Sequence, residues 1–377
     1  MPPSGSETAS VGTVEDDMSN DRPEALDQIV AWSRPQQGAP PAELEDPRNY
    51  LVFDRLPGAE APDDPSGPFA AGPEGRMTVS DPATVLGVVV GAVETVTPED
   101  VASEVADAAT DGPSYIPDWT AVSATPPIAP AAERPVLVRR NGTRVRPEWV
   151  IAPDARSAYY PNTYPYSVVG RIFVWPDAAA PNWAWWGTGS LISARAILTA
   201  SHVVPWGSAN WKALFVPAYY DGASIHGAWA ASWVTNAHGY SSHAQGDDMA
   251  VMRLDVPLGS SLGWFGFRTY HPGWEDLSVW TLPGYPWDKD GGNRPWLHLN
   301  FPIIDDDDDG AGVELEYQAD TEGGQSGAPV FAWFNGSPDV VGTHSGGENN
   351  VGEPRQNVAA GGNALTNLLH WARNNWP

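Results

Sequence analysis

From Tyr164 to the end of the chain, short runs of apolar and β-branched residues alternate with clusters of glycine, proline, asparagine and aspartate. Short runs separated by turn-forming residues at this spacing are typical of antiparallel sandwiches and barrels. The runs are 167–174, 188–192, 213–216, 249–254, 278–282, 313–317 and 340–342. This pattern predicts an all-β domain in the second half of the chain.

The C-terminal residues follow a different period. Their apolar side chains recur at the i, i+3, i+4 and i+7 positions of a helix, as Leu365, Leu368, Leu369 and Ala372. Asn363 is a suitable N-cap for such a helix. We predict a terminal helix over residues 363–374 that packs on the β-domain.

Residues 1–148 show neither period. They hold 21 of the 38 prolines but two of the 19 tryptophans. Each proline removes a hydrogen-bond donor and restricts the residue before it, so little of this segment is expected to form a packed core. We interpret residues 1–148 as a partly disordered pro-region, either a small pro-domain or an acidic tail, and residues 149–377 as the folded domain.

Charge and cysteine content exclude several classes of function. The 47 acidic and 20 basic residues give a net charge of -27, which repels the phosphates of nucleic acids. The chain has no cysteine, so neither disulfides nor a thiol nucleophile are available. The longest apolar stretch, residues 85–93, is about half as long as a membrane-spanning helix. We therefore expect no nucleic-acid partner and no membrane insertion.

Three local patterns follow one another in the order histidine, aspartate, serine. An apolar strand at 197–201 ends directly at His202, where an imidazole can accept a proton from a hydroxyl nucleophile. Asp247 and Asp248 precede the strand 249–254. We choose Asp248 to orient the imidazole, because the acid next to the strand is better placed for burial. Asp247 is then expected to be a solvated turn residue.

The third pattern is a serine flanked by glycines, Gly323-Gly324-Gln325-Ser326-Gly327. Glycine allows a sharp turn that aims successive N–H groups at one point. The N–H groups of Gly324 and Ser326 are therefore candidates for an oxyanion hole beside the nucleophile Ser326. Each pattern alone also fits an ordinary core histidine, a polar turn or a Gly/Ser loop.

Taken together, the three patterns resemble the bacterial glutamyl endopeptidase branch of the chymotrypsin-like serine proteases. The resemblance covers roughly residues 150–377. It includes the framework segments 163–166, 263–267 and 284–289. It implies a serine endopeptidase with His202, Asp248 and Ser326 as its catalytic triad.

The same resemblance implies an architecture and a setting. Two six-stranded antiparallel β-barrels are expected at about 160–258 and about 262–360, followed by the C-terminal helix. The enzyme would need no cofactor and would act on proteins and peptides. We expect it to be monomeric and secreted, although its opening residues do not resemble a signal peptide. A catalytically silent, protein-binding homologue is the alternative from another class.

The resemblance extends to the primary specificity pocket. In that family, a threonine five residues before the nucleophile and a histidine just before Ser-Gly-Gly bind a glutamate carboxylate, and Thr321 and His344 occupy these positions. Ser345 would line the floor and hydrogen-bond Asp248. However, Asp320 stands where trypsin-like enzymes carry the carboxylate that binds arginine or lysine, so cleavage after basic residues stays an alternative.

Activation is also implied by the resemblance. Residues 149–156 resemble the start of mature glutamyl endopeptidases, which begin with a Val-Ile pair or one residue earlier, and Glu148 lies directly upstream. We expect cleavage after Glu148, with the Arg-Arg pair at 139–140 as the alternative, to release a propeptide and bring the new amine at or beside Val150 near the pocket. The activating ion pair of trypsin is not available, because Gln325 stands where an aspartate would be needed.

One acidic run satisfies the formal calcium-loop pattern, through Asp305, Asp307, Asp309, Gly310 and Glu316. No helix precedes the run, and a strand follows it at once, as a hairpin would require. We therefore favour a solvated acidic turn over weak, structural calcium binding. The histidines show no zinc signature, which argues against a metalloprotease.

Overall fold

The computed structural model describes residues 111–129, 149–151, 153–240, 245–348 and 355–377, together with short pieces of the first 110 residues. These pieces are 22–25, 28, 34–35, 53–55, 77–79 and 93–95. The expected processing sites, Glu148 and the pair at 139–140, lie outside the described residues, as does most of the apolar stretch 85–93.

Six antiparallel strands close into the first barrel. They pair in the order β12-β7-β6-β5-β8-β11, and β11 pairs in turn with β12, so no edge stays open among these six. The strands are β5 (Val169–Trp175), β6 (Trp185–Leu191), β7 (Ala196–Thr199), β8 (Lys212–Pro217), β11 (Ser232–Gly239) and β12 (Ala250–Leu254). A further strand, β3 (Val93–Thr95), lies parallel to β11.

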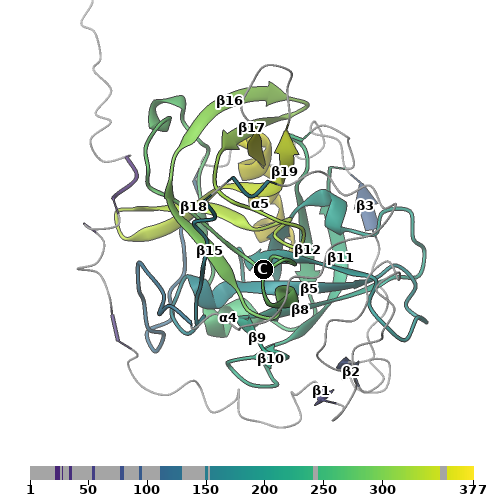
Figure 1. Cartoon of the computed structure of the whole chain (residues 1–377). Coiled ribbons are helices and arrows are strands. Elements are labelled where there is room, and N and C mark those ends of the chain that lie inside the picture. Colours follow the sequence, from purple (N-terminus) through teal and green to yellow (C-terminus); the bar gives the residue numbers. More distant parts are fainter. Residues whose placement is uncertain are drawn as a thin grey trace, which may run out of the picture.

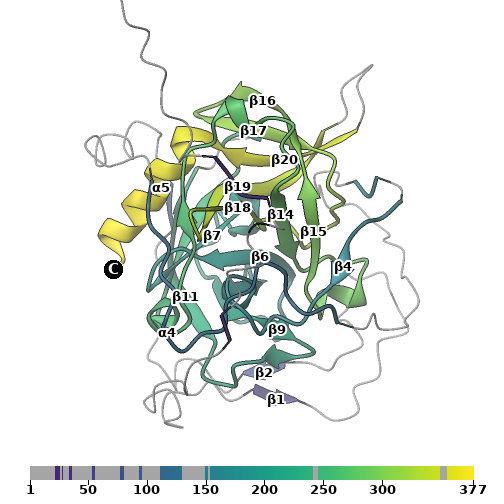
Figure 2. The ribbon, with the colours of Figure 1, turned by 90° about the vertical axis from the view of Figure 1, so that its left-hand side faces the viewer.

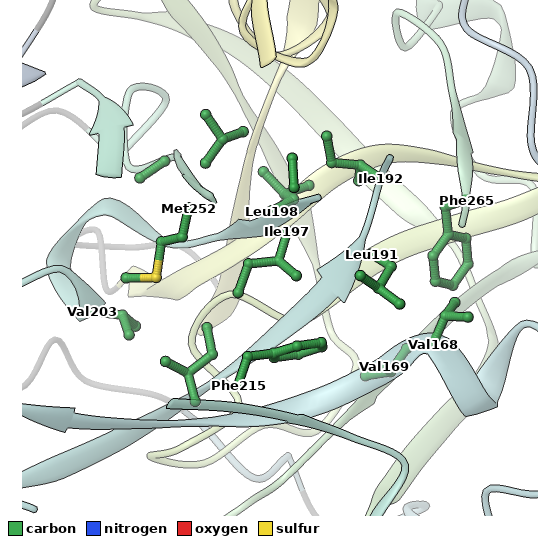
Figure 3. Packing of buried hydrophobic residues seen from close by; sticks show 14 of the residues in the cluster. Val168, Val169, Leu191, Ile192, Ile197, Leu198, Val203, Phe215, Met252 and Phe265 are labelled. Atoms are coloured by element: carbon green, nitrogen blue, oxygen red, sulfur yellow. The ribbon is translucent and has the colours of Figure 1, made fainter. Parts of the chain in front are cut away.

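The first barrel is filled by apolar side chains from all of its walls. Every residue of β5 and of β7 is buried. Leu191, Ile197, Phe215 and Met252, from four different strands, gather in one cluster (Figure 3). Burial of apolar surface stabilises the fold by roughly 25 cal/mol per Å². The cluster therefore gives a rigid support to the residues that follow these strands.

The second barrel is a curled sheet whose two ends are consecutive in the chain. Its strands pair in the order β16-β17-β20-β19-β18-β14-β15. They are β14 (Trp280–Gly284), β15 (Trp296–Phe301), β16 (Ile303–Asp309), β17 (Gly312–Tyr317), β18 (Pro329–Phe334), β19 (Ser337–Glu348) and β20 (Gln356–Gly361). Because Pro302 alone separates β15 from β16, these two form one bent strand that joins the two sides of the curled sheet. The predicted architecture of two six-stranded barrels is confirmed.

Short elements extend and connect the barrels, which lie one above the other in Figures 1 and 2. β13 (Gly266–Phe267) pairs with β19, and β4 (Ser157–Ala158) pairs with β15. The remaining elements are β1 (Phe53–Arg55) with β2 (Met77–Val79), β9 (Tyr219–Tyr220) with β10 (Ala223–Ser224), the helix α4 (Leu258–Leu262), and the 3-10 turns η5 (Tyr166–Val168), η6 (Ser201–Val203), η7 (Pro272–Trp274) and η8 (Asp290–Gly292).

The C-terminal helix α5 (Gly362–Asn375) contacts strands of both barrels (Figure 2). Its predicted apolar face is buried. The predicted cap is wrong, because Gly361 holds the N-cap position and Asn363 already lies inside the helix. The side-chain oxygen of Asn363 instead accepts a 3.2 Å hydrogen bond from the Thr269 hydroxyl. Among the helices in the described part of the chain, none combines the length and apolar character needed to cross a bilayer.

Residues 111–129, here called the N-terminal strap, run along the two-barrel domain. They make β-bridges at Gly112–Phe267, Tyr115–Trp264, Val122–Tyr164 and Ile128–Tyr159. Val122 and Ala124 belong to the main buried cluster. The hydroxyl of Tyr166 donates a 2.5 Å hydrogen bond to the carbonyl of Ala124. This part of the Pro-rich half, in which little packed core was expected, is therefore packed against the domain.

Candidate active site

His202 lies at the end of a strand of the first barrel. β7 runs into the turn η6, which leaves the His202 side chain 34% exposed. Nδ1 of its ring lies 2.6 Å from Oδ2 of Asp248, and its backbone N–H donates to Oδ1 of the same carboxylate at 2.9 Å. With Nδ1 directed at the carboxylate, Nε2 points away from it. This orientation suits an imidazole that exchanges a proton through Nε2.

Asp248 is a buried carboxylate that both barrels share. It precedes β12 and is 2% exposed. Besides the two contacts with His202, it accepts a 2.6 Å hydrogen bond from the hydroxyl of Ser345, on β19 of the second barrel. Such charge-assisted hydrogen bonds offset the cost of removing a carboxylate from water. The structure therefore brings His202, Asp248 and Ser345 together.

The neighbouring carboxylate, Asp247, differs from the expectation. It is 5% exposed, and its Oδ1 accepts hydrogen bonds from the N–H groups of Ala311 (2.7 Å) and Gly312 (3.0 Å) at the tip of the β16–β17 hairpin. In return, Oδ2 of Asp309 accepts from the N–H groups of residues 245 and 246 at 2.6 and 3.2 Å. The prediction of a solvated turn residue is wrong, because backbone donors far along the chain bury this carboxylate.

The acidic run forms the hairpin that the sequence favoured over a calcium loop. In the register of this hairpin, Asp305 lies opposite Glu316 and Asp307 lies opposite Glu314. Both aspartates are exposed. Burial and neighbouring carboxylates raise the pKa of Asp306 above its ordinary value. Within the residues that the structure describes, no group of three or more histidine or acidic side chains is arranged to hold a metal ion.

Ser326 follows a tight turn between β17 and β18. Gly324 and Gly327 have φ angles of +96° and +87°, which an L side chain rarely adopts. A Cβ atom on Gly324 would also lie 2.5 Å from Nε1 of Trp186 and from the carbonyl oxygen of Tyr285. Glycine is therefore required on both sides of the nucleophile candidate, which is 5% exposed.

Two close approaches bring Ser326 to the histidine end of the first barrel. A Cβ atom on Gly187 would lie 2.7 Å from Val203, the neighbour of His202, and 3.0 Å from the carbonyl oxygen of Ser326. The N–H of Gly327 donates to the carbonyl of His344 at 2.7 Å. The residue after His344 is Ser345, which contacts Asp248. The three sequence patterns therefore converge at one junction between the barrels.

The family model for trypsin matches residues 157–371, more than half of the chain. The chain belongs to the trypsin family. It is a serine endopeptidase of this family, whose members act on protein and peptide substrates. The matched range contains both barrels and most of α5.

Two curated proteins resemble this trypsin-family chain. Glutamyl endopeptidase of Bacillus licheniformis is 29% identical over 147 residues, which span 38% of this chain and 44% of that enzyme. A protein named extracellular metalloprotease of Bacillus subtilis is 23% identical over 243 residues, 62% of this chain and 73% of that protein. A solved structure of Glu endopeptidase in complex with MPD superposes with a TM-score of 0.49 at 21% identity, over 60% of this chain and 100% of that one.

Thr321 and His344, the expected pocket residues of this trypsin-family enzyme, are both completely buried. Among the described residues, the hydroxyl of Thr321 has no hydrogen-bond partner. Nδ1 of His344 lies 2.7 Å from the hydroxyl of Tyr317 and 3.2 Å from the carbonyl of Val358, which fixes the orientation of the ring. No local motif marks Tyr317 in the sequence, because its partner lies 27 residues away.

Asp320 is directed at the backbone of the segment that follows the expected cleavage site. It is 1% exposed. Oδ1 accepts from the N–H of Ile151 at 2.6 Å, and Oδ2 accepts from the N–H of Ala155 at 2.7 Å. Its own N–H donates to Nδ1 of His298 at 2.9 Å. Burial lowers the pKa of His298, against the opposing effect of the Asp320 carboxylate.

The segment around Val150 already lies beside Thr321 in the full chain. Asn357 clamps the backbone of Trp149: its Oδ1 accepts from Trp149 N–H at 3.0 Å and its Nδ2 donates to Trp149 O at 2.8 Å. The same carbonyl accepts from the N–H of Thr321 at 3.1 Å. The Arg355 guanidinium stacks over the Trp149 ring at 4.1 Å. The sequence contains no motif that points to Asn357.

Proposed function

We propose that the enzyme hydrolyses peptide bonds by acyl transfer, with Ser326 as nucleophile. Nε2 of His202 takes the hydroxyl proton as Ser326 attacks the peptide carbonyl, and then delivers it to the leaving amine. Asp248 holds the tautomer with Nδ1 protonated and stabilises the imidazolium. Water then takes the place of the amine: His202 removes its proton as it attacks the acyl-enzyme, and returns that proton to Ser326 as the acyl group is released. The 2.6 Å contact between His202 and the buried Asp248 carboxylate is the observation that carries this proposal.

The N–H groups of Gly324 and Ser326 form the proposed oxyanion hole. The left-handed conformation of Gly324, at φ +96°, turns the backbone sharply just before the nucleophile and supports this role. The carbonyl of Gly324 accepts a 2.8 Å hydrogen bond from the hydroxyl of Thr188, which holds the turn against the first barrel. The chemistry requires no metal or cofactor, since the proton transfers and charge stabilisation all come from protein groups.

Replacement of the nucleophile tests the mechanism. Ser326→Ala is expected to lower kcat by about 10⁶-fold, because the covalent path is lost. The variant should keep the melting temperature of the parent protein, which excludes unfolding as the cause. Undiminished hydrolysis by purified Ser326→Ala would contradict the proposal, whereas loss of hydrolysis excludes a catalytically silent homologue.

We propose that the enzyme cleaves after glutamate (or aspartate). The unpartnered, buried hydroxyl of Thr321 supports this specificity, because a buried donor without a partner gains a full hydrogen bond from an incoming carboxylate. His344 supplies a second polar side chain. The contacts of Asp320 argue against the trypsin-like alternative, since both of its oxygens accept from the backbone of residues 151 and 155.

Three peptides that differ only in the residue before the cut, which is glutamate, glutamine or arginine, test the specificity. The glutamate peptide should be cleaved with a higher kcat/KM than the arginine peptide. The glutamine peptide shows how much of that preference depends on charge. Faster cleavage of the arginine peptide would favour the trypsin-like alternative and contradict the assignment of Thr321 and His344.

We propose that the chain is a zymogen that matures by cleavage after Glu148. The new ammonium at Trp149 would keep the clamp of Asn357 and add a positive charge beside Thr321. If maturation removes one residue more, Val150 carries that charge. N-terminal sequencing of the active form is the test: a start at Trp149 or Val150 is expected, and a start far from both contradicts the proposal. We further propose a secreted monomer.

A further inference from the structure

Gln325, directly before Ser326, closes the turn that forms the proposed oxyanion hole. It is completely buried. Its side-chain Oε1 accepts from the N–H of Glu322 at 3.2 Å, and its own N–H donates to the carbonyl of Glu322 at 3.1 Å. Gly324 lies inside this closed turn. The position of its N–H therefore depends on where the side chain of Gln325 is held.

The guanidinium of Arg156 holds that side chain. Nη1 of Arg156 donates to Oε1 of Gln325 at 3.2 Å, and the Arg156 side chain is completely buried. Two carboxylates fix the guanidinium: Asp154 accepts from Nε (3.0 Å) and Nη2 (2.9 Å), and Asp288 accepts from Nη1 (3.1 Å) and Nη2 (2.6 Å). Lys289 contacts the Asp154 carboxylate at 2.8 Å.

This arrangement keeps a charged, rigid donor next to the turn. Burial alone would lower the pKa of Arg156, but the hydrogen bonds that it donates to Asp154 and Asp288 outweigh burial and raise it. The same contacts lower the pKa of Asp154, although burial opposes them. The planar guanidinium can serve two carboxylates and an amide at once, which the single ammonium of lysine cannot do with the same geometry.

We propose that Arg156 is a positioning residue for the oxyanion hole, acting through Gln325 on the N–H groups of Gly324 and Ser326. The inference rests on the proposed function. Arg156 lies after both candidate processing sites, and it contacts Gln325 in the uncleaved chain. The oxyanion turn is therefore organised before processing. The uncleaved zymogen is then less active because it binds the substrate side chain weakly, and cleavage after Glu148 lowers KM and leaves the chemical step unchanged.

A double-mutant cycle in the full chain tests this role. Arg156→Gln and Gln325→Ala should each lower kcat by about 10- to 100-fold, with KM within about threefold, because an oxyanion donor acts on the transition state. The double variant should be no slower than the slower single variant, since both changes interrupt one chain of contacts. Gln325→Ala leaves the Asp154–Arg156–Asp288 cluster intact, so it stays informative even where Arg156→Gln folds poorly.

Arg294→Gln is the matched control. Arg294 donates from Nε and Nη2 to Asp221, at 2.9 and 2.7 Å, and this pair has no contact with residues 322–326 among the described hydrogen bonds. Arg294→Gln should leave kcat unchanged. The positioning role would be overturned if the fold-loss of kcat in the double variant equalled the product of the two single losses. It would also be overturned if Arg294→Gln lost as much kcat as Arg156→Gln.

The same kinetics separate this inference from the proposed function. Unchanged kcat in Arg156→Gln, together with inactive Ser326→Ala, overturns the positioning role alone. Undiminished hydrolysis by Ser326→Ala overturns both. A Glu148→Gln chain that remains uncleaved after Glu148 should match the processed enzyme in kcat and differ from it in KM, whereas a kcat deficit in the uncleaved chain would show that the turn forms only after processing.

Discussion

The hydroxyl of Ser345, on β19 of the second barrel, donates a 2.6 Å hydrogen bond to Oδ2 of Asp248, which precedes β12 of the first barrel. The same oxygen lies 2.6 Å from Nδ1 of His202. One carboxylate oxygen thus joins the two barrels and the imidazole. Any shift between the barrels would change the orientation of His202.

Ser345→Ala should weaken catalysis without unfolding the protein. The change removes one charge-assisted hydrogen bond, worth about 1.5–3 kcal/mol, from a carboxylate that is 2% exposed. We expect kcat/KM to fall by about 10- to 100-fold. Steady-state kinetics measure the loss, and Ser224→Ala, at a short hairpin outside the site, is the control. Parent-like kinetics in Ser345→Ala would show that the contact does not matter.

Thr321→Val should separate affinity from stability. Valine has nearly the shape of threonine, and the hydroxyl that it removes is buried without a partner, so the melting temperature should stay equal or rise. KM for glutamyl peptides should rise about tenfold, with kcat nearly unchanged. Thr343→Val is the matched control, because Thr343 is also completely buried and its hydroxyl has no partner in the part of the chain that the structure describes. Equal effects of both changes would contradict a specific role for Thr321.

Asp247→Ala should loosen the loop that carries Asp248. It leaves the N–H groups of Ala311 and Gly312 without their acceptor, at a cost of about 1–3 kcal/mol in the free energy of unfolding. Because the neighbouring residue orients His202, kcat should fall as well. Asp307→Ala, an exposed acid on the same hairpin, should change neither quantity. Urea unfolding and kinetics on both variants decide the matter.

The N-terminal strap should stabilise the two-barrel domain. Val122 is 8% exposed within the main buried cluster, whereas Ile128, on the same strap, is 79% exposed. Val122→Asp should lower the free energy of unfolding by about 2–4 kcal/mol, because a charge without a partner enters an apolar site. Ile128→Asp should change it by less than about 0.5 kcal/mol. Equal stability of the two variants would show that the strap adds nothing to the fold.

Acid should destabilise the fold through His226. Burial lowers the pKa of His226 from 6.5 to about 4, against a backbone hydrogen bond to Ser167 that raises it. As the pH falls below 6.5, the unfolded chain takes up a proton here first, so the free energy of unfolding decreases by about 1–3 kcal/mol until the folded histidine titrates near 4. Urea unfolding across this range should show a flatter pH dependence for His226→Gln. A slope in His226→Gln equal to that of the parent would contradict this prediction.

The order of the three active-site patterns and the all-β class follow from local sequence. A strand that ends at His202, an acid that precedes a strand and a serine between glycines are each encoded within a few residues. Local backbone geometry decides such features, so a single sequence is enough to propose them. The strand segments and the apolar face of α5 follow for the same reason.

For other polar groups, the tertiary structure alone decided which partner they meet. Asp247 caps backbone groups 64 residues away, Asp320 caps Ile151 at a separation of 169, and Arg156 reaches Gln325 at the same separation. Their partners are mostly backbone N–H groups or a buried amide, which every sequence contains and no composition reveals. A carboxylate looks the same in sequence whether water or a distant turn surrounds it, and only the folded chain decides between the two.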